Sequence, residues 1–141
     1  MSRMGWIAGG LAIVIAVVFG GLYLLPDSTS TPSADEVAQP VAFDQALAGK
    51  GEELTASNGC TSCHSIDGSD GVGPSWKGIY NTQVDIGTGK VKVDAAYVKT
   101  SIVDPNAEVS SGYGPSMPSY DGKLSDDEIE AIVEYIKSLN G

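Results

Sequence analysis

The side chains with the greatest capacity for chemistry lie together in one short segment, Cys60-Thr61-Ser62-Cys63-His64. The chain of 141 residues contains no other cysteine and no other histidine. A structural zinc site usually needs four cysteine or histidine ligands, and this chain can supply only three. A disulfide between cysteines this close would close a very short loop and would stabilise the fold little. The segment therefore needs a different explanation.

The spacing Cys-x-x-Cys-His is the attachment signature of haem c, in which two thiols add across the vinyl groups of the porphyrin. The histidine that follows is then placed under the iron as its proximal ligand. The alternative is a redox-active dithiol of the thioredoxin type, which requires a βαβ unit that the sequence does not show. We therefore predict one haem c, bound covalently through Cys60 and Cys63, with His64 on the iron.

The sixth ligand of the iron can be narrowed by elimination. Met1 and Met4 adjoin an N-terminal apolar run, which leaves Met117, 53 residues after His64. The alternative role for Met117 is packing on a core face, but its Pro-rich segment has neither a helical nor a strand period. We predict ligation by His64 and Met117, which raises the reduction potential of the iron. With both axial positions filled, no position is left for O₂ or a substrate.

The N-terminal apolar run, residues 5–25, contains no charged residue. Its 21 residues would form ~31 Å of helix, and the hydrocarbon core of a bilayer is about 30 Å thick. A cleaved signal peptide has a shorter apolar core and ends in a small-x-small site, which this sequence lacks. We predict a retained transmembrane anchor. Because Arg3 precedes the run and only acidic groups follow it closely, the N-terminus is expected in the cytoplasm.

Composition divides the chain into three expected parts. Residues 1–26 are the anchor, residues 27–42 are a flexible linker rich in Ser, Thr, Pro and acidic residues, and residues 43–141 are one folded domain. The part after the anchor carries seven Lys against 18 Asp and Glu. Such a surface repels nucleic acid and anionic lipid headgroups. It indicates either ordinary solubility or docking onto a basic partner.

The folded domain is expected to be mostly helical. Asp44 can cap a helix over about residues 45–56, and Asp94 can cap a second helix that ends at Asp104-Pro105. Ser125 to Glu128 form a capping box that opens a final helix with one apolar face. Gly87-Thr88-Gly89 separates two short apolar segments and predicts a hairpin. We therefore expect a domain of three helices and long loops packed around a flat cofactor.

These residues together resemble the class I cytochromes c over residues 43–139, about 70% of the chain. The domain looks most like the cytochrome c domain fused to subunit II of some haem–copper oxidases and like the membrane-anchored monohaem cytochromes of bacterial respiratory chains. The segments that carry the resemblance are NGCTSCHSIDG (residues 58–68), GVGPSWKG (71–78), YVKTSIVDP (97–105), GYGPSMPSY (112–120) and the final helix.

The resemblance implies a class I cytochrome c fold, with three main helices around one haem, and it assigns two further haem-site residues. The backbone carbonyl of Pro74 would accept a hydrogen bond from the second ring nitrogen of His64. Trp76 would pack against the haem edge, or would simply fill the core, or both. Gly51 stands where the first helix of the family has a small residue. Thr55 stands where an aromatic residue is usual, which leaves the packing of the first helix on the last one open.

The resemblance also implies a one-electron carrier rather than an enzyme. It would accept electrons from a quinol-oxidising complex and pass them to a terminal oxidase, on the periplasmic side of a bacterial cytoplasmic membrane. The domain would be either a shuttle that moves on its linker or a fixed subunit of an oxidase or a supercomplex. A haem-based sensor or peroxidase, with Met117 displaced, is the remaining alternative, and the sequence offers no distal histidine or arginine to assist it.

Overall fold

The computed structural model describes residues 40–141. The predicted membrane span and nearly all of the predicted linker lie outside this part, so the three-part division of the chain stays a prediction. Within residues 40–141, no helix is long and apolar enough to cross a membrane.

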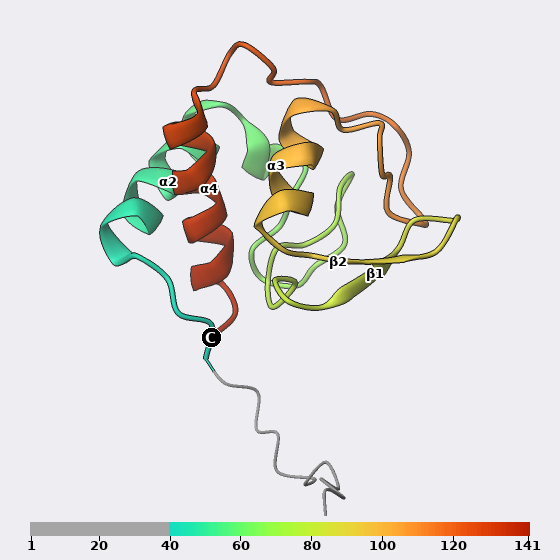
Figure 1. Ribbon diagram of the computed structural model, residues 1–141, viewed down its shortest axis with the longest axis horizontal. Helices are drawn as coiled ribbons and strands as arrows, with labels where there is room; N and C mark the ends of the chain where they lie inside the picture. The colour runs from blue at the N-terminus through green and yellow to red at the C-terminus, as the bar shows by residue number, and fades with distance from the viewer. Residues whose placement is uncertain (1–39) are drawn as a thin grey trace, which may run out of the picture. The chain divides into compact units, whose positions relative to one another are not determined.

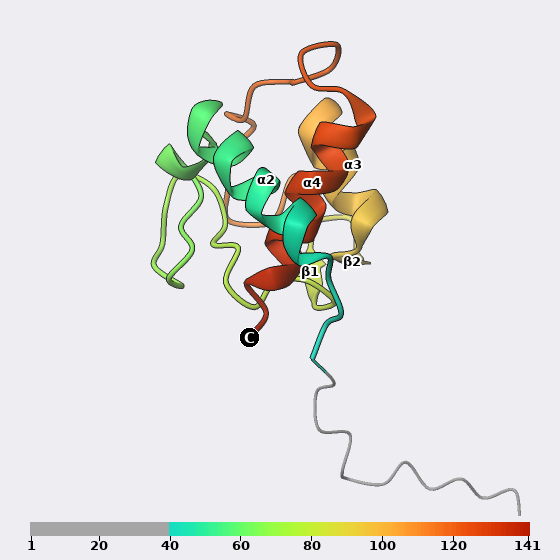
Figure 2. The same ribbon diagram turned by 90° about the vertical axis from the view of Figure 1, so that its left-hand side faces the viewer.

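The described residues form a mostly helical domain with three α-helices and long loops (Figure 1). The last helix lies against both of the others, and Figure 2 shows it crossing the first helix closely. In chain order the elements are α2 (Gln45–Ser57), a 3₁₀ turn η1 (Cys60–Ser62), β1 (Gln83–Asp85), β2 (Lys90–Lys92), α3 (Ala95–Val103) and α4 (Asp126–Ser138). This arrangement confirms the predicted three-helix domain.

Each of the three helices begins at the predicted cap, where a side-chain oxygen accepts a backbone N–H that the helix leaves unpaired. Asp44 accepts from the N–H of Leu47 at 2.9 Å, and Asp94 accepts from that of Tyr97 at 3.0 Å. Ser125 starts α4 with a complete capping box. The second helix ends at Val103, directly before the predicted stop at Asp104-Pro105.

The predicted hairpin is present and short. Strands β1 and β2 pair antiparallel, with Val84 opposite Val91. The turn closes with a hydrogen bond of 2.9 Å from the N–H of Ile86 to the carbonyl of Gly89. Gly87 has a φ of 82°, a left-handed conformation that glycine adopts without strain.

The core is built around the apolar face of α4, as its helical period predicts. Val133 is completely buried there, and Leu139, at the end of the helix, is only half-buried. The other buried residues of this face are Ile129, Ile132 and Ile136. They pack against residues from α3 and from the segments on either side of the hairpin, which are Trp76, Tyr80, Val93, Val98 and Ile102.

The crossing of α2 and α4 depends on two small residues of α2. A side chain at Gly51 would collide with the carbonyl of Ala131, and its Cβ would lie 2.8 Å from the Cβ of Tyr135. Thr55 is fully buried, and its hydroxyl donates to the carbonyl of Glu52 at 2.9 Å. The family pattern left this packing open. The two helices pack closely, because Thr55 fills little space and satisfies its own hydroxyl within α2.

We expect Gly51→Ala to destabilise the domain by about 1–3 kcal/mol, because the added methyl group has no space against the backbone of α4. Gly49→Ala is the matched control, since Gly49 lies on the same helix with nothing within 4 Å of a Cβ. It should be neutral or stabilise by about 0.5–1 kcal/mol. Urea denaturation followed by circular dichroism measures both. Equal stability of the two variants would show that the helices do not cross at Gly51.

Candidate haem-binding site

The segment Cys60 to His64 is presented by the end of α2. The helix stops at Asn58, and Gly59, with a φ of 74°, turns the chain by a left-handed step that favours glycine. The 3₁₀ turn η1 follows at once, and the N–H of His64 then donates to the carbonyl of Cys60 at 3.1 Å. One tight turn therefore holds both thiols and the imidazole.

A cavity of about 390 Å³ opens beside this turn. A second cavity of about 80 Å³ lies against α3 and α4 and shares several wall residues with it. The predicted site residues in the wall of the larger cavity are Cys60, Cys63, His64, Pro74 and Met117. Trp76 lines the smaller cavity, together with four of those five. The structure therefore brings all six predicted site residues together.

His64 is held in one orientation by three neighbours. Its Nδ1 lies 2.8 Å from the carbonyl oxygen of Pro74, the hydrogen bond that the resemblance implied. A carbonyl oxygen only accepts, so Nδ1 carries the proton and Nε2 keeps its lone pair. Burial lowers the pKa of His64, and the bond to Pro74 opposes this only in part. A Cβ at Gly73 would lie 2.6 Å from Cε1 of the imidazole, so only glycine fits beside the ring.

Trp76 packs against the imidazole of His64. The two rings are stacked, with centroids 4.8 Å apart and planes inclined by 15°. Trp76 also makes a T-shaped contact with Tyr135 on α4, with ring centroids 6.4 Å apart. Trp76 is 8% exposed and belongs to the core cluster, so it fills the core, while its contact with the haem edge stays a prediction.

The two cysteines are not joined by a disulfide and lie in different surroundings. Cys63 is exposed, and Cys60 is half-buried. Burial raises the pKa of the Cys60 thiol, and the neighbouring hydroxyl of Tyr120 lowers it in part. Both residues line the larger cavity.

Met117 lines the cavity from the loop between α3 and α4, residues 104–124, here called the methionine loop. Hydrogen bonds hold this loop to the hairpin and to the end of α3. The N–H of Ser111 donates to the carbonyl of Asp85 at 2.7 Å, and the N–H of Tyr120 donates to the carbonyl of Ile102 at 3.0 Å. The sequence did not predict these two hydrogen bonds. Tyr120 falls within a segment that carried the family resemblance, but no local pattern pairs Asp85 with Ser111.

The residues present fit a haem. A neutral imidazole with a free Nε2 and a methionine thioether line one cavity, and these are an established axial pair for haem iron. Cys60 and Cys63 line the same cavity and are not joined by a disulfide. The cavity volume lies within the range of about 300–1,000 Å³ typical of ligand sites. Within residues 40–141, no group of three or more His, Cys, Asp or Glu side chains could hold a metal ion on its own.

The comparisons with known proteins define the class. The sequence profile of the family described as "Cytochrome c" matches residues 48–140. The chain therefore belongs to the cytochrome c family, has a class I cytochrome c-like fold, and carries haem c attached through Cys60 and Cys63. Membership also supports haem-based electron transfer.

Particular relatives are similar at moderate identity. Cytochrome c2 iso-1 of Magnetospirillum fulvum is 30% identical over 97 residues, which cover 60% of this chain and 95% of that protein. The solved structure of a cytochrome c from Rhodothermus marinus is 26% identical, with a TM-score of 0.49, and the match covers 74% of this chain and 85% of that one. An engineered cytochrome c from Rhodothermus marinus, bound to a carbene intermediate, is also 26% identical, with a TM-score of 0.46 over 74% of this chain and 86% of that one.

We expect Gly73→Ala to displace the His64 imidazole, because the new methyl group would occupy the space of the ring. The domain should lose about 1–3 kcal/mol of stability, and the Nδ1–H proton resonance of His64 should shift in the reduced, diamagnetic protein. Gly49→Ala serves again as the control that adds a methyl group away from the cavity. An unchanged resonance in Gly73→Ala would mean that the ring does not rest on Gly73.

Proposed function

We propose that this protein is a membrane-tethered one-electron carrier of a respiratory chain. Its haem iron would be held by His64 and Met117, and electrons would pass from a quinol-oxidising complex to a terminal oxidase. The observation that carries the proposal is that His64 and Met117, 53 residues apart in the chain, line the same cavity. When bound, haem c supplies reversible one-electron exchange at its iron.

The chain's own residues have three tasks in this proposal. Cys60 and Cys63 attach the group, and His64 offers Nε2 in a fixed direction because Pro74 and Trp76 hold the ring. Met117 would supply the second protein ligand of the iron and exclude other ligands. A fixed pair of ligands changes little between oxidation states, which favours fast electron transfer over binding of a substrate.

The wall of the cavity supports a carrier over a peroxidase or a gas sensor. Those functions need an open axial position, and peroxide chemistry commonly uses a distal histidine or arginine as well. His64 is the single histidine of the chain, and its single arginine is Arg3. The protein is therefore proposed not to be an enzyme.

The apolar run at residues 5–25 supports the proposed location, a single-pass anchor in a bacterial cytoplasmic membrane with the haem domain on the periplasmic side. Tethering raises the effective concentration of the domain near its partners, so weak docking suffices. This holds both for a shuttle and for a fixed subunit of an oxidase or supercomplex. Copurification of the full chain with oxidase subunits in mild detergent would select the fixed subunit.

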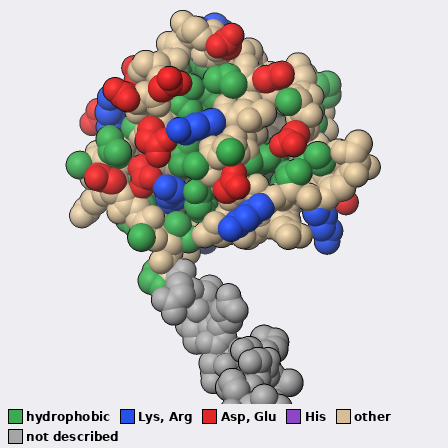
Figure 3. Space-filling view, viewed as in Figure 1, with side chains coloured by type: hydrophobic (Ala, Val, Ile, Leu, Met, Phe, Trp, Pro, Cys, Tyr) green, Lys and Arg blue, Asp and Glu red, His purple; other side chains and the backbone are tan. Residues whose placement is uncertain are grey.

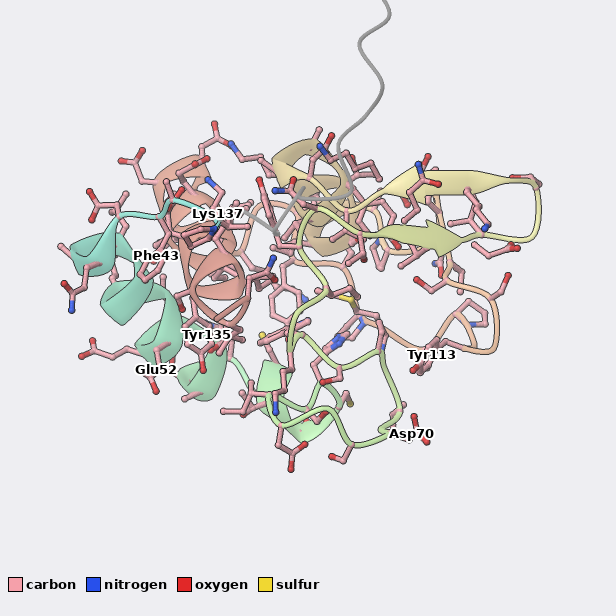
Figure 4. The ribbon with its side chains drawn as sticks, turned by 90° about the horizontal axis from the view of Figure 1, so that it is seen from below. Phe43, Glu52, Asp70, Tyr113, Tyr135 and Lys137 are labelled. Atoms are coloured by element: carbon pink, nitrogen blue, oxygen red, sulfur yellow. The ribbon has the colours of Figure 1, made fainter. Side chains whose placement is uncertain are left out.

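The charge of the domain favours partners with a basic surface. Residues 40–141 contain seven Lys and 15 Asp and Glu, and Figure 3 shows acidic side chains spread over the face that it presents. Lys99 and Lys137 are paired with Glu130 and Glu134, which removes them as free basic groups. In Figure 4, Asp70 projects at the outer end of its loop, on the same side of the domain as Tyr113, which lines the cavity.

We expect Met117→Leu to lose the weak far-red absorption band of methionine-ligated ferric haem and to bind CO when reduced. Its reduction potential should fall by roughly 0.1 V or more, because the thioether raises the potential and axial ligands set haem potentials over a range of about 0.8 V. Redox titration of the full chain in detergent measures this.

Met117→His is the matched variant, since it keeps the sixth position filled. It should lose the far-red band and lower the potential but should not bind CO. A far-red band that persists in either variant, or an unsubstituted protein that binds CO readily, would contradict ligation by Met117 and reopen the sensor or peroxidase alternative.

We expect Asp70→Lys to slow reduction of the full chain by quinol-oxidising membranes by roughly 3–10-fold at low salt, because it weakens attraction to a basic partner. Glu52→Lys makes the same change of charge on α2, on another side of the domain (Figure 4), and should have a smaller effect. The difference should shrink as salt rises. Stopped-flow measurement gives both rates, and equal slowing by the two variants would exclude docking near Asp70.

A further inference from the structure

Tyr120 joins the two segments that carry the axial ligands. It follows Met117 by three residues, and its hydroxyl donates a hydrogen bond of 2.9 Å to the carbonyl of Asn58. Asn58 is the cap of α2, two residues before Cys60. The contact therefore runs from the methionine loop directly to the backbone that presents the haem-attachment turn.

No second bond of this kind exists in the part of the chain that the structure describes. The methionine loop makes its other hydrogen bonds to two elements. One is the hairpin, at Asp85, and the other is α3, at Ile102 and Val103 among others. These bonds anchor the loop, but they do not fix its distance from the turn at residues 60–64. Among the hydrogen bonds of residues 40–141, that of the Tyr120 hydroxyl alone spans the two segments.

The side chain of Tyr120 is well placed to act on the site. It is half-buried and lies in the walls of both cavities, and its hydroxyl is next to the sulfur of Cys60. Its backbone N–H donates to the carbonyl of Ile102 at 3.0 Å, so the backbone of Tyr120 is anchored to α3. The backbone of Tyr120 is thus bound to α3 and its hydroxyl to Asn58, so the residue connects the methionine loop to the attachment turn across the cavity.

We propose that Tyr120 is a positioning residue that keeps Met117 on the haem iron by tying the methionine loop to the attachment turn. The inference rests on the proposed His64/Met117 ligation. For an external ligand to replace Met117, the loop must move away from the turn, and the hydrogen bond to Asn58 opposes that movement. Phenylalanine at this position keeps the ring and its packing but leaves the Asn58 carbonyl without this donor.

The test is displacement of Met117 by imidazole in the oxidised full-length protein, followed through loss of the far-red band. We expect Tyr120→Phe to bind imidazole about fivefold more tightly than the unsubstituted protein, since a typical hydrogen bond contributes a factor of this order. Tyr80→Phe is the matched control. Tyr80 is as buried as Trp76, lies outside both cavity walls, and its hydroxyl makes no hydrogen bond within the described residues.

Two results would overturn the inference, and they differ. If the unsubstituted protein shows no far-red band, ligation by Met117 fails, and the positioning role fails with it. If the band is present but Tyr120→Phe and Tyr80→Phe bind imidazole with equal affinity, the ligation stands and Tyr120 only fills space. A purely structural role would lower the midpoint of thermal unfolding without changing the imidazole affinity, so circular dichroism melts of both variants separate the two roles.

Discussion

The site depends first on the hydrogen bond between Nδ1 of His64 and the carbonyl of Pro74. It places the proton of the imidazole on Nδ1, and it therefore leaves Nε2 as the nitrogen with a lone pair available to iron. Gly73 must be a glycine for this arrangement, because its missing side chain is the space that the imidazole occupies. The Cys-x-x-Cys-His turn supplies the imidazole, and the following loop, with Gly73 and Pro74, fixes the orientation of the ring.

That orientation is connected to the packing of the helices through a short series of contacts. The imidazole stacks on Trp76, and Trp76 makes a T-shaped contact with Tyr135 in α4. Tyr135 in turn lies where a side chain at Gly51 would have to be. The crossing of α2 and α4 is thus connected to the His64 imidazole through Tyr135 and Trp76.

The methionine side of the cavity is held in a different way. The loop around Met117 has no regular secondary structure, and its prolines remove backbone donors. It is held by separate hydrogen bonds to the hairpin, to the end of α3 and to the cap of α2. The Met117 side chain also packs, partly buried, against the core cluster. In the proposed ligation, retention of Met117 depends on these separate loop contacts, whereas the His64 ring is held by Pro74 and Trp76.

The sequence by itself determined the covalent chemistry and the helices. Two thiols and an imidazole within five residues need no tertiary contact to be recognised. Asp44, Asp94 and Ser125 each cap a helix by bonding a backbone N–H three residues further on, so these local caps could be predicted and were observed. Elimination also singled out Met117, since the chain has so few alternatives.

Only the tertiary structure decided how α2 crosses α4 with Thr55 in place of an aromatic residue, and that Tyr120 reaches Asn58. The physical reason is that these contacts join residues far apart in the sequence, 62 positions for Tyr120 and Asn58. Local patterns of hydrophobicity and capping contain no information about such distances.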